Sequence, residues 1–316
     1  MSPTLLPPDY RVVYLILAHR APAQVARLVR RLYHRQSRVW VHVDRRADEA
    51  AFRRFLAPLG VRFVRDRQAV YWGTFSLVAA MRAGMRAIRA AGEGFDHLVV
   101  LSGQDYPLVG TQALLTTLAA HRTESLVSYA ALGPDNNPHL LSRLTKYHLP
   151  LPGQRALVYP FEPGRGGLRA VLNAALRLTG WYPLPRPLPL PWAHLYFGSN
   201  WVRLRPEAVD WVLDQPARYP AIDRFFRRTR VPDEHYFQTL LLNATDAERG
   251  PVWNTNLTFS HWHRPAARYA EPLGWDDRAA LGTSGCLFAR KFDETADGRI
   301  LDWLDAESCF TKTHDS

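Results

Sequence analysis

The first third of the chain alternates between fully apolar segments and segments whose apolar residues recur every three or four positions. The apolar segments are rich in β-branched and aliphatic residues, which is typical of buried strands, and they cover residues 11–18, 39–43, 61–64 and 97–101. The amphipathic segments predict helices at residues 21–34, 48–56 and 76–91. Fully apolar strands separated by helices indicate parallel strands covered on both faces. We therefore expect an α/β fold with a mostly parallel, doubly wound sheet.

The alternation weakens after this region and proline becomes frequent. Residues 183–192 (PLPRPLPLPW) have a polyproline-like composition that predicts a stiff, exposed excursion. This excursion is either a plain connector or a loop that shapes an acceptor groove, with Trp181 and Trp192 as candidates for stacking on a sugar. Regular patterns return with GSNWVRL at residues 198–204, and a further helix is predicted after Pro232–Glu234, where carboxylates favour a helix start.

Composition narrows the class of protein. The 316 residues carry 40 Lys and Arg against 29 Asp and Glu, a formal charge of +11 that suits a nucleic acid, an anionic membrane or a phosphate-bearing ligand. Only three of the cations are lysines, namely Lys146, Lys291 and Lys312. Two cysteines, Cys286 and Cys309, cannot form a disulfide framework, and no apolar run reaches the roughly 18 residues that span a bilayer. We expect a globular protein of a reducing compartment.

Polar and aromatic residues follow three of the predicted strands. His19, Asp44 and Asp105 each come directly after or shortly after a strand, and Trp72 precedes a helix for which Ser76 is the predicted N-cap. Open parallel sheets bind ligands at the carboxyl ends of their strands. The chain has neither G-x-G-x-x-G nor G-x-x-x-x-G-K-[ST], so it lacks both the dinucleotide fingerprint and the P-loop. These residues predict a nucleotide-sized crevice of another kind.

Seven segments appear in a characteristic order: VYLILAHRAPAQVARLVRRLYH, VHVDRR, VYWGTFSL, LSGQDYPL, GSNWVRL, VPDEHYFQTLLLN and LFARKFD. Together they resemble the core-2/I-branching β-1,6-N-acetylglucosaminyltransferase and peptide O-xylosyltransferase family, glycosyltransferase family 14, over residues 11–294. The resemblance implies a GT-A-like, Rossmann-type fold. It also implies an inverting transfer of a sugar, GlcNAc or xylose, from a UDP-sugar to an acceptor hydroxyl, with a β-linked product, no cofactor and no divalent metal.

The absence of a metal requires other charges at the leaving diphosphate. The chain contains no Asp-x-Asp, the usual metal-binding motif of this fold, and fixed cations can stabilise a developing negative charge instead. The resemblance assigns this role to Arg290 and Lys291, since Arg presents a planar fork to phosphate oxygens and Lys a compact charge. In the family, a further cation at the diphosphate comes from a segment upstream of this pair. Arg264 and Arg268 are both candidates, and we favour Arg264.

Single displacement needs a base that takes the proton of the attacking hydroxyl. The family's base matches Glu234 of the Pro-Asp-Glu motif, so we predict that Glu234 is catalytic. Its neighbour Asp233 is expected to be a capping or loop carboxylate, and His235 has no precedent in the family as a base.

The resemblance also assigns the nucleotide contacts. Asp44 matches a carboxylate that hydrogen-bonds the uridine, and Trp72 matches an aromatic residue that lies against the uracil. His19 would lie at the same crevice, although a lone histidine after a strand is commonly a structural residue.

The donor sugar is expected near three further residues. Asp105 lies where the fold's metal-binding carboxylate would be, and it is expected to orient the ribose or the donor sugar. Ser199 and Asn200 are expected near the donor sugar or the acceptor. Some family members have an acid or a glutamine at the position of Asn200, which leaves the identity of the sugar open.

We predict one catalytic domain. Residues 1–10 are an irregular leader and residues 11–316 form the domain, in which residues 11–124 bind the nucleotide, residues 125–197 form an acceptor-side excursion and residues 198–294 hold the catalytic and diphosphate-binding residues. The chain has none of the signal anchor, stem and disulfides of the animal members, so we expect a bacterial-type protein of the cytoplasm.

The expected partners are a UDP-sugar donor and a glycan, lipid-linked or peptide acceptor. The positive charge leaves open a peripheral contact with an anionic membrane on the inner face of the cell membrane. A nucleic-acid-binding protein is the alternative from another class, but the arginines are scattered and no recognition motif appears, so no nucleic acid is expected. A homologue that binds sugar without turnover is the other alternative.

Overall fold

The computed structural model describes residues 6–260 and 271–306, except residues 134, 147, 151–156 and most of 159–193. Its centre is a seven-stranded sheet with the strand order β12-β6-β11-β4-β1-β2-β3. The strands are β1 (Val12–Ala18), β2 (Ser37–Val43), β3 (Arg62–Phe63), β4 (His97–Ser102), β6 (Ser125–Val127), β11 (Arg203–Leu204) and β12 (Val252–Asn254). Only β11 runs antiparallel to its neighbours among these strands. The predicted α/β class and mostly parallel sheet are confirmed.

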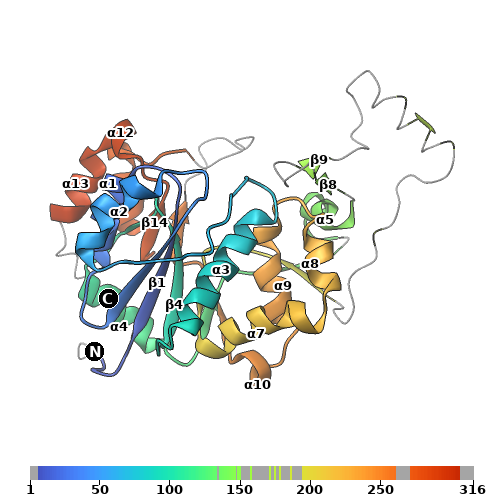
Figure 1. Ribbon diagram of the computed structural model, residues 1–316, viewed down its shortest axis with the longest axis horizontal. Helices are drawn as coiled ribbons and strands as arrows, with labels where there is room; N and C mark the ends of the chain where they lie inside the picture. Colours follow the sequence, from blue (N-terminus) through green and yellow to red (C-terminus); the bar gives the residue numbers. More distant parts are fainter. Residues whose placement is uncertain are drawn as a thin grey trace.

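Helices cover both faces of this sheet (Figure 1). One face packs against α1 (Pro22–Leu32), α2 (Glu49–Leu56), α4 (Thr111–Ala120) and α13 (Arg299–Ala306). The other face packs against α3 (Ser76–Ala90), α7 (Pro206–Arg218), α8 (Ala221–Phe226) and α9 (Tyr236–Leu242). Successive side chains of a strand point to opposite faces, so Tyr14 and Ile16 join the first core and Val13 and Leu15 the second. This two-sided burial explains why β1 is apolar throughout.

One glycine shows how tightly the second layer packs. A Cβ atom at Gly84, in the middle of α3, would lie 2.5 Å from Cδ1 of Leu15 on β1. A larger residue at position 84 would push α3 away from the sheet.

A smaller sheet lies beside the end of β4 and brings the C-terminal segment to the same region. It consists of β13 (Thr258–Ser260), β14 (Phe288–Arg290) and β5 (Tyr106–Pro107) in the order β13-β14-β5. Two strand pairs complete the sheets, β7 (Ala130–Leu132) with β10 (Leu195–Phe197) and β8 (Leu149–Pro150) with β9 (Leu157–Val158). The short helices are η1 (Ala57–Leu59), α5 (Pro138–Thr145), η3 (Pro232–Glu234), α10 (Asp246–Arg249), η4 (Trp275–Asp277), α11 (Arg278–Thr283) and α12 (Glu294–Asp297).

The predicted N-cap of α3 is wrong. The helix begins at Ser76 itself and its N-cap is Phe75, without a side-chain cap. The hydroxyl of Ser76 instead accepts a hydrogen bond of 2.8 Å from the backbone amide of Tyr71 and lies 2.7 Å from the hydroxyl of Thr74. The Ser76 side chain therefore stabilises the loop before the helix, and the hydroxyl of Thr74 accepts from the backbone amide of Ser76 at 3.3 Å.

The main sheet takes its strands from residues 12 to 254, and the division of the domain into three parts stays a prediction. Within the part of the chain that the structure describes, no helix is both long and apolar enough to cross a membrane.

Candidate functional site

Three residues predicted from strand ends lie at one edge of the sheet. In the strand order, β1 stands between β4 and β2, and all three strands are parallel. Their carboxyl ends therefore meet, with His19 after β1, Asp44 after β2 and Asp105 shortly after β4. A hydrogen bond of 2.7 Å from the amide of Asp44 to the carbonyl oxygen of Ala18 joins two of these ends directly.

Asp44 is held by several donors although it is almost fully buried, with 3% of its surface exposed. Its Oδ1 accepts from the backbone amide of Arg46 at 2.8 Å, and its Oδ2 accepts from Nη2 of Arg46 at 3.0 Å and from the amide of Val70 at 3.1 Å. Burial alone would raise the pKa of Asp44, but the hydrogen bonds from Arg46 and Val70 outweigh it and lower the pKa. Asp44 is thus an ionised, fixed acceptor.

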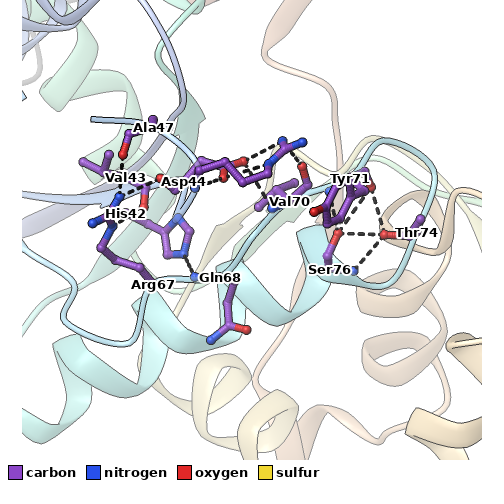
Figure 2. Close-up of polar contacts among 11 residues, drawn as sticks. His42, Val43, Asp44, Ala47, Arg67, Gln68, Val70, Tyr71, Thr74 and Ser76 are labelled. Carbon is purple, nitrogen blue, oxygen red and sulfur yellow. Dashed lines mark hydrogen bonds and ion pairs between the residues drawn. The ribbon is translucent and has the colours of Figure 1, made fainter. Parts of the chain in front are cut away.

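Arg67 and His42 hold the segment around Asp44 in place through hydrogen bonds to its backbone and to Gln68 (Figure 2). The guanidinium of Arg67 donates to the carbonyl oxygens of Val43, Asp44 and Ala47. Nε2 of His42 accepts from the amide of Gln68 at 2.8 Å, and burial lowers the pKa of His42 to about 4. His42 is therefore neutral at physiological pH and serves as a structural acceptor.

Trp72 lies in the loop between β3 and α3, which we call the Trp72 loop (residues 70–75). Its side chain is 55% exposed, and the guanidinium carbon of Arg46 lies 4.3 Å from the ring centroid of neighbouring Tyr71. Gly73 adopts a left-handed φ of 73°, and its carbonyl oxygen accepts from the amide of Val231 at 3.0 Å. The Trp72 loop is thus joined to the segment that precedes Glu234.

Positive charge gathers around His19. Burial lowers the pKa of His19, and the charges of Arg20, Arg46 and Lys291 lower it further while Asp44 opposes them. Burial also lowers the pKa of Lys291. Nη2 of Arg20, the residue after His19, donates to Oδ2 of Asp293 at 3.1 Å, so the segment that carries Lys291 is joined to the residues that follow β1.

Asp105 pairs with Arg290. The Asp105 side chain is completely buried, and it accepts from the amide of Ser102 at 2.7 Å and from the hydroxyl of Ser102 at 2.8 Å. Nε of Arg290 donates to Oδ1 of Asp105 at 3.0 Å, and the guanidinium carbon of Arg290 lies 4.4 Å from the centroid of the Trp201 ring. The buried carboxylate of Asp105 is thus bound to a guanidinium.

Glu234 ends the turn η3, which we call the PDE turn (Pro232–Glu234). Its side chain is 34% exposed, and Oε2 accepts from Nη1 of Arg143 on α5 at 2.7 Å. Its carbonyl oxygen accepts from the amide of Gly198 at 2.8 Å. A Cβ atom at Gly198 would lie 1.8 Å from the carbonyl oxygen of Ser128, so only glycine allows this approach. Glu234 is accessible, oriented and close to GSNW.

Asp233 points the opposite way from its neighbour, into the protein. It is 6% exposed, and Oδ2 accepts from Nδ2 of Asn200 at 2.9 Å. Burial, followed by the charge of Glu234, raises the pKa of Asp233 to about 7. The carbonyl oxygen of Ser199 accepts from Nε2 of Gln238 at 2.6 Å. Asn200 is thus fixed to the PDE turn, and Ser199 to the helix after it.

His235 is buried and is held by a backbone contact. Its Nδ1 lies 3.1 Å from the carbonyl oxygen of Tyr196, and burial lowers its pKa to about 3. A neutral histidine that donates to a backbone carbonyl is a structural residue.

These contacts form one continuous path across the site. The Trp72 loop binds Val231, the PDE turn binds Asn200, and the next residue, Trp201, lies against Arg290, which binds Asp105. Arg290, Lys291 and the strand ends together provide positive charge that can bind an anionic ligand. In the part of the chain that is described, no group of three or more His, Cys, Asp or Glu residues is placed to hold a metal ion.

Some predicted residues cannot be placed and some contributors are new. Arg264, Arg268, Trp181 and Trp192 lie outside the described residues. The sequence analysis missed Arg46, Arg143 and Trp201. Arg46 and Trp201 each lie one or two residues from a predicted site residue, which could have drawn attention to them, whereas nothing in the sequence pattern distinguishes Arg143.

A mostly parallel sheet with helices on both faces and charged residues at its carboxyl edge defines an open α/β protein, a class that binds its ligands at this edge. The Core-2/I-Branching enzyme family model matches residues 12–277, and the chain belongs to this family. The chain is 26% identical to xylosyltransferase 2 of Homo sapiens, over 94% of this chain and 34% of that protein. It is 26% identical to beta-glucuronosyltransferase GlcAT14B of Arabidopsis thaliana, over 95% of this chain and 66% of that protein.

A solved cytidylyltransferase from Leptospira borgpetersenii serovar Hardjo-bovis (strain JB197) has a TM-score of 0.28 and 18% identity over 38% of this chain and 54% of that chain. The chain spans about a third of the xylosyltransferase and about two thirds of the plant enzyme. Family membership and the two named transferases indicate a glycosyltransferase.

Proposed function

We propose that this protein is an inverting, metal-independent glycosyltransferase that moves a sugar from a UDP-sugar to an acceptor hydroxyl. The observation that carries the proposal is the continuous path of contacts that joins the PDE turn to the Trp72 loop on one side and to Arg290 on the other. This path connects a partly exposed carboxylate with a group of cations, the two kinds of residue that a single displacement needs.

In the proposed reaction, Asp44 and Trp72 hold the uridine and Arg290 and Lys291 bind the diphosphate. The acceptor oxygen attacks the anomeric carbon and its proton passes to Glu234. The bond between the anomeric carbon and the diphosphate oxygen breaks, and UDP leaves with the bonding electron pair. The cations stabilise this charge where it develops.

The Asp105–Arg290 pair supports independence from a metal. A carboxylate whose Oδ1 already accepts from Ser102 and a guanidinium is a poor ligand for a divalent cation, while the guanidinium itself carries positive charge toward the phosphates. The two named relatives support xylose and glucuronate as transferred sugars, and GlcNAc is added by the family resemblance. A cytoplasmic location with contact to an anionic membrane, and a glycan, lipid-linked or peptide acceptor, stay predictions from the sequence.

The test is release of UDP from UDP-xylose, UDP-GlcNAc, UDP-glucuronate, UDP-glucose and UDP-galactose in the presence of EDTA, with water as the acceptor. We expect turnover of at least one donor, with the Glu234→Gln variant as the control for non-enzymatic hydrolysis. If no donor is turned over, the proposal is wrong. If turnover disappears in EDTA and returns with Mg²⁺ or Mn²⁺, the protein is a transferase but needs a metal.

A further inference from the structure

Two contacts fix the guanidinium of Arg290, one at its Nε edge and one at its planar face. Nε donates to Oδ1 of Asp105 at 3.0 Å, and the guanidinium carbon lies 4.4 Å from the centroid of the Trp201 ring. The side chain keeps 21% of its surface exposed. Within the described residues, its two Nη groups have no hydrogen-bond partner, and neither is buried. The edge that carries both Nη groups is therefore the part of Arg290 that can meet a ligand.

Asp105 cannot turn away from Arg290. Oδ2 accepts from the amide of Ser102 and Oδ1 accepts from its hydroxyl, at 2.7 and 2.8 Å, and no part of the Asp105 side chain is exposed. Both oxygens are thus fixed by the turn after β4, which also fixes the direction of the Nε hydrogen bond. The pair offsets a buried negative charge that would otherwise repel a phosphate.

Trp201 is fixed in the same way from the other side. The indole is 6% exposed, and the backbone oxygen of Trp201 accepts from Nη1 of Arg203 at 2.9 Å. Arg203 is itself 1% exposed, and its Nη2 donates to the hydroxyl of Thr258 on β13 at 2.6 Å. Since β13 pairs with β14, which ends at Arg290, the ring and the guanidinium are anchored to the same small sheet.

We propose that Asp105 and Trp201 are positioning residues that set the plane of Arg290, so that its two Nη groups bind two oxygens of the donor diphosphate. This inference rests on the proposed function. An arginine that is already held by Nε and by an aromatic face loses little conformational freedom on binding, and its fork matches phosphate geometry. The positioned guanidinium then offers hydrogen bonds of fixed direction in addition to its charge, whereas a mobile surface cation offers only charge.

The test compares binding of UDP and of uridine by calorimetry. Trp201→Leu should weaken UDP about fivefold, the scale of one cation–π contact, and leave uridine unchanged. Trp201→Phe should restore most of the loss because it keeps an aromatic face. Arg290→Lys, which keeps the charge but lacks Nε and the planar fork, should bind UDP almost as weakly as Arg290→Ala. In the Arg290→Ala background, Trp201→Leu should have no further effect.

Trp40→Leu is the matched control. Trp40 is 7% exposed and lies under a guanidinium, with the carbon of Arg62 at 5.6 Å from its ring, but it stands in β2 before the site. Trp40→Leu should lower the stability of the protein without weakening UDP binding more than uridine binding. The positioning role is overturned if Arg290→Lys binds UDP like the wild type, or if Trp201→Leu weakens UDP and uridine equally. If the wild type does not bind UDP at all, the proposed function fails together with this inference.

Discussion

Two buried aspartates have pKa values that are shifted in opposite directions, although burial by itself raises both. Asp44 at the end of β2 and Asp233 in the PDE turn are 3% and 6% exposed. The pKa of Asp44 is lowered, because Arg46 and two backbone amides donate to it and outweigh burial. The pKa of Asp233 is raised to about 7, because burial and the charge of Glu234 outweigh its amide donor Asn200. The cation and the donors around Asp44 favour its ionised form, whereas burial and the neighbouring anion Glu234 favour the protonated form of Asp233.

The same difference holds for the two regions as a whole. The proposed nucleotide side (Asp44, Arg46 and the Trp72 loop) is built at the ends of parallel strands, where backbone amides and carbonyls hold the charged residues. The PDE turn is held by pairs of side chains from separate elements, such as Glu234 with Arg143 and Asp233 with Asn200. We therefore expect changes on the proposed nucleotide side to affect binding and folding together, whereas in the PDE turn a change at Glu234 should affect activity and a change at Asp233 should affect stability.

Glu234→Gln should have the largest effect. Glutamine keeps the size of the side chain but cannot take the proton of the acceptor, and general-base catalysis contributes roughly 10²- to 10⁴-fold. We expect kcat for sugar transfer to fall by about 10³-fold while the affinity for UDP changes less than about twofold. Steady-state transfer rates and calorimetry with UDP measure the two quantities. Full activity in this variant would remove Glu234 as the base.

Asp44→Asn should lower stability and nucleotide affinity at once. The NH2 group of asparagine would face at least one of the donors that now bind the carboxylate, and that donor would lose its acceptor. The loss should lower the free energy of unfolding by about 2 kcal/mol. Because the pKa of Asp44 is lowered, its stabilisation is present above its usual pKa and is lost as the pH falls through the folded value. The difference in stability should therefore be seen at neutral pH and should narrow in acid.

Chemical denaturation across pH and calorimetry with uridine measure these effects. Asp48→Asn is the matched control in the same loop, because asparagine replaces aspartate as an N-cap at little cost. If Asp44→Asn has the stability and uridine affinity of this control, the nucleotide side does not depend on the carboxylate.

Asp233→Asn should have the smallest effect on stability, and this effect should depend on pH in the opposite direction to that of Asp44→Asn. A carboxyl with a raised pKa contributes stability below its unfolded pKa and loses it as the pH rises through the folded value, here about 7. Between pH 6 and pH 8 the wild type should lose about 1.4 kcal/mol relative to this variant. Thermal unfolding at several pH values measures the difference.

Glu234→Gln serves as the control for this scan. Removal of the Glu234 charge should lower the pKa of Asp233 and move the loss of stability to lower pH. A wild type and an Asp233→Asn variant with parallel pH profiles would contradict the raised pKa and the comparison built on it.

Much of the nucleotide side could be predicted from the sequence. Residues directly after parallel strands share one edge of the sheet by geometry alone, which is why His19, Asp44 and Asp105 could be grouped in advance. The contacts of the PDE turn could not be grouped in this way. Arg143 and Glu234 are 91 positions apart, and no local pattern connects α5 with the PDE turn.

The N-cap of α3 shows the same limit within a short distance. Ser76 precedes an apolar periodic segment and has the residue type of a cap, yet its hydroxyl bonds the Trp72 loop instead. Helix propensity describes a helix end in isolation, whereas here the loop provides a better partner for the hydroxyl.

The strands and helices of the first third, the two-sided burial of the sheet and the edge at which the charged residues gather could all be predicted from the sequence. These features follow from periodicity and from the order of elements, because backbone geometry fixes where each side chain of a strand or helix points. Which charges pair could not be predicted and became visible only in the folded chain. Arg290 meets Asp105 across 185 positions and lies over Trp201, and this choice depends on how separate elements pack against each other.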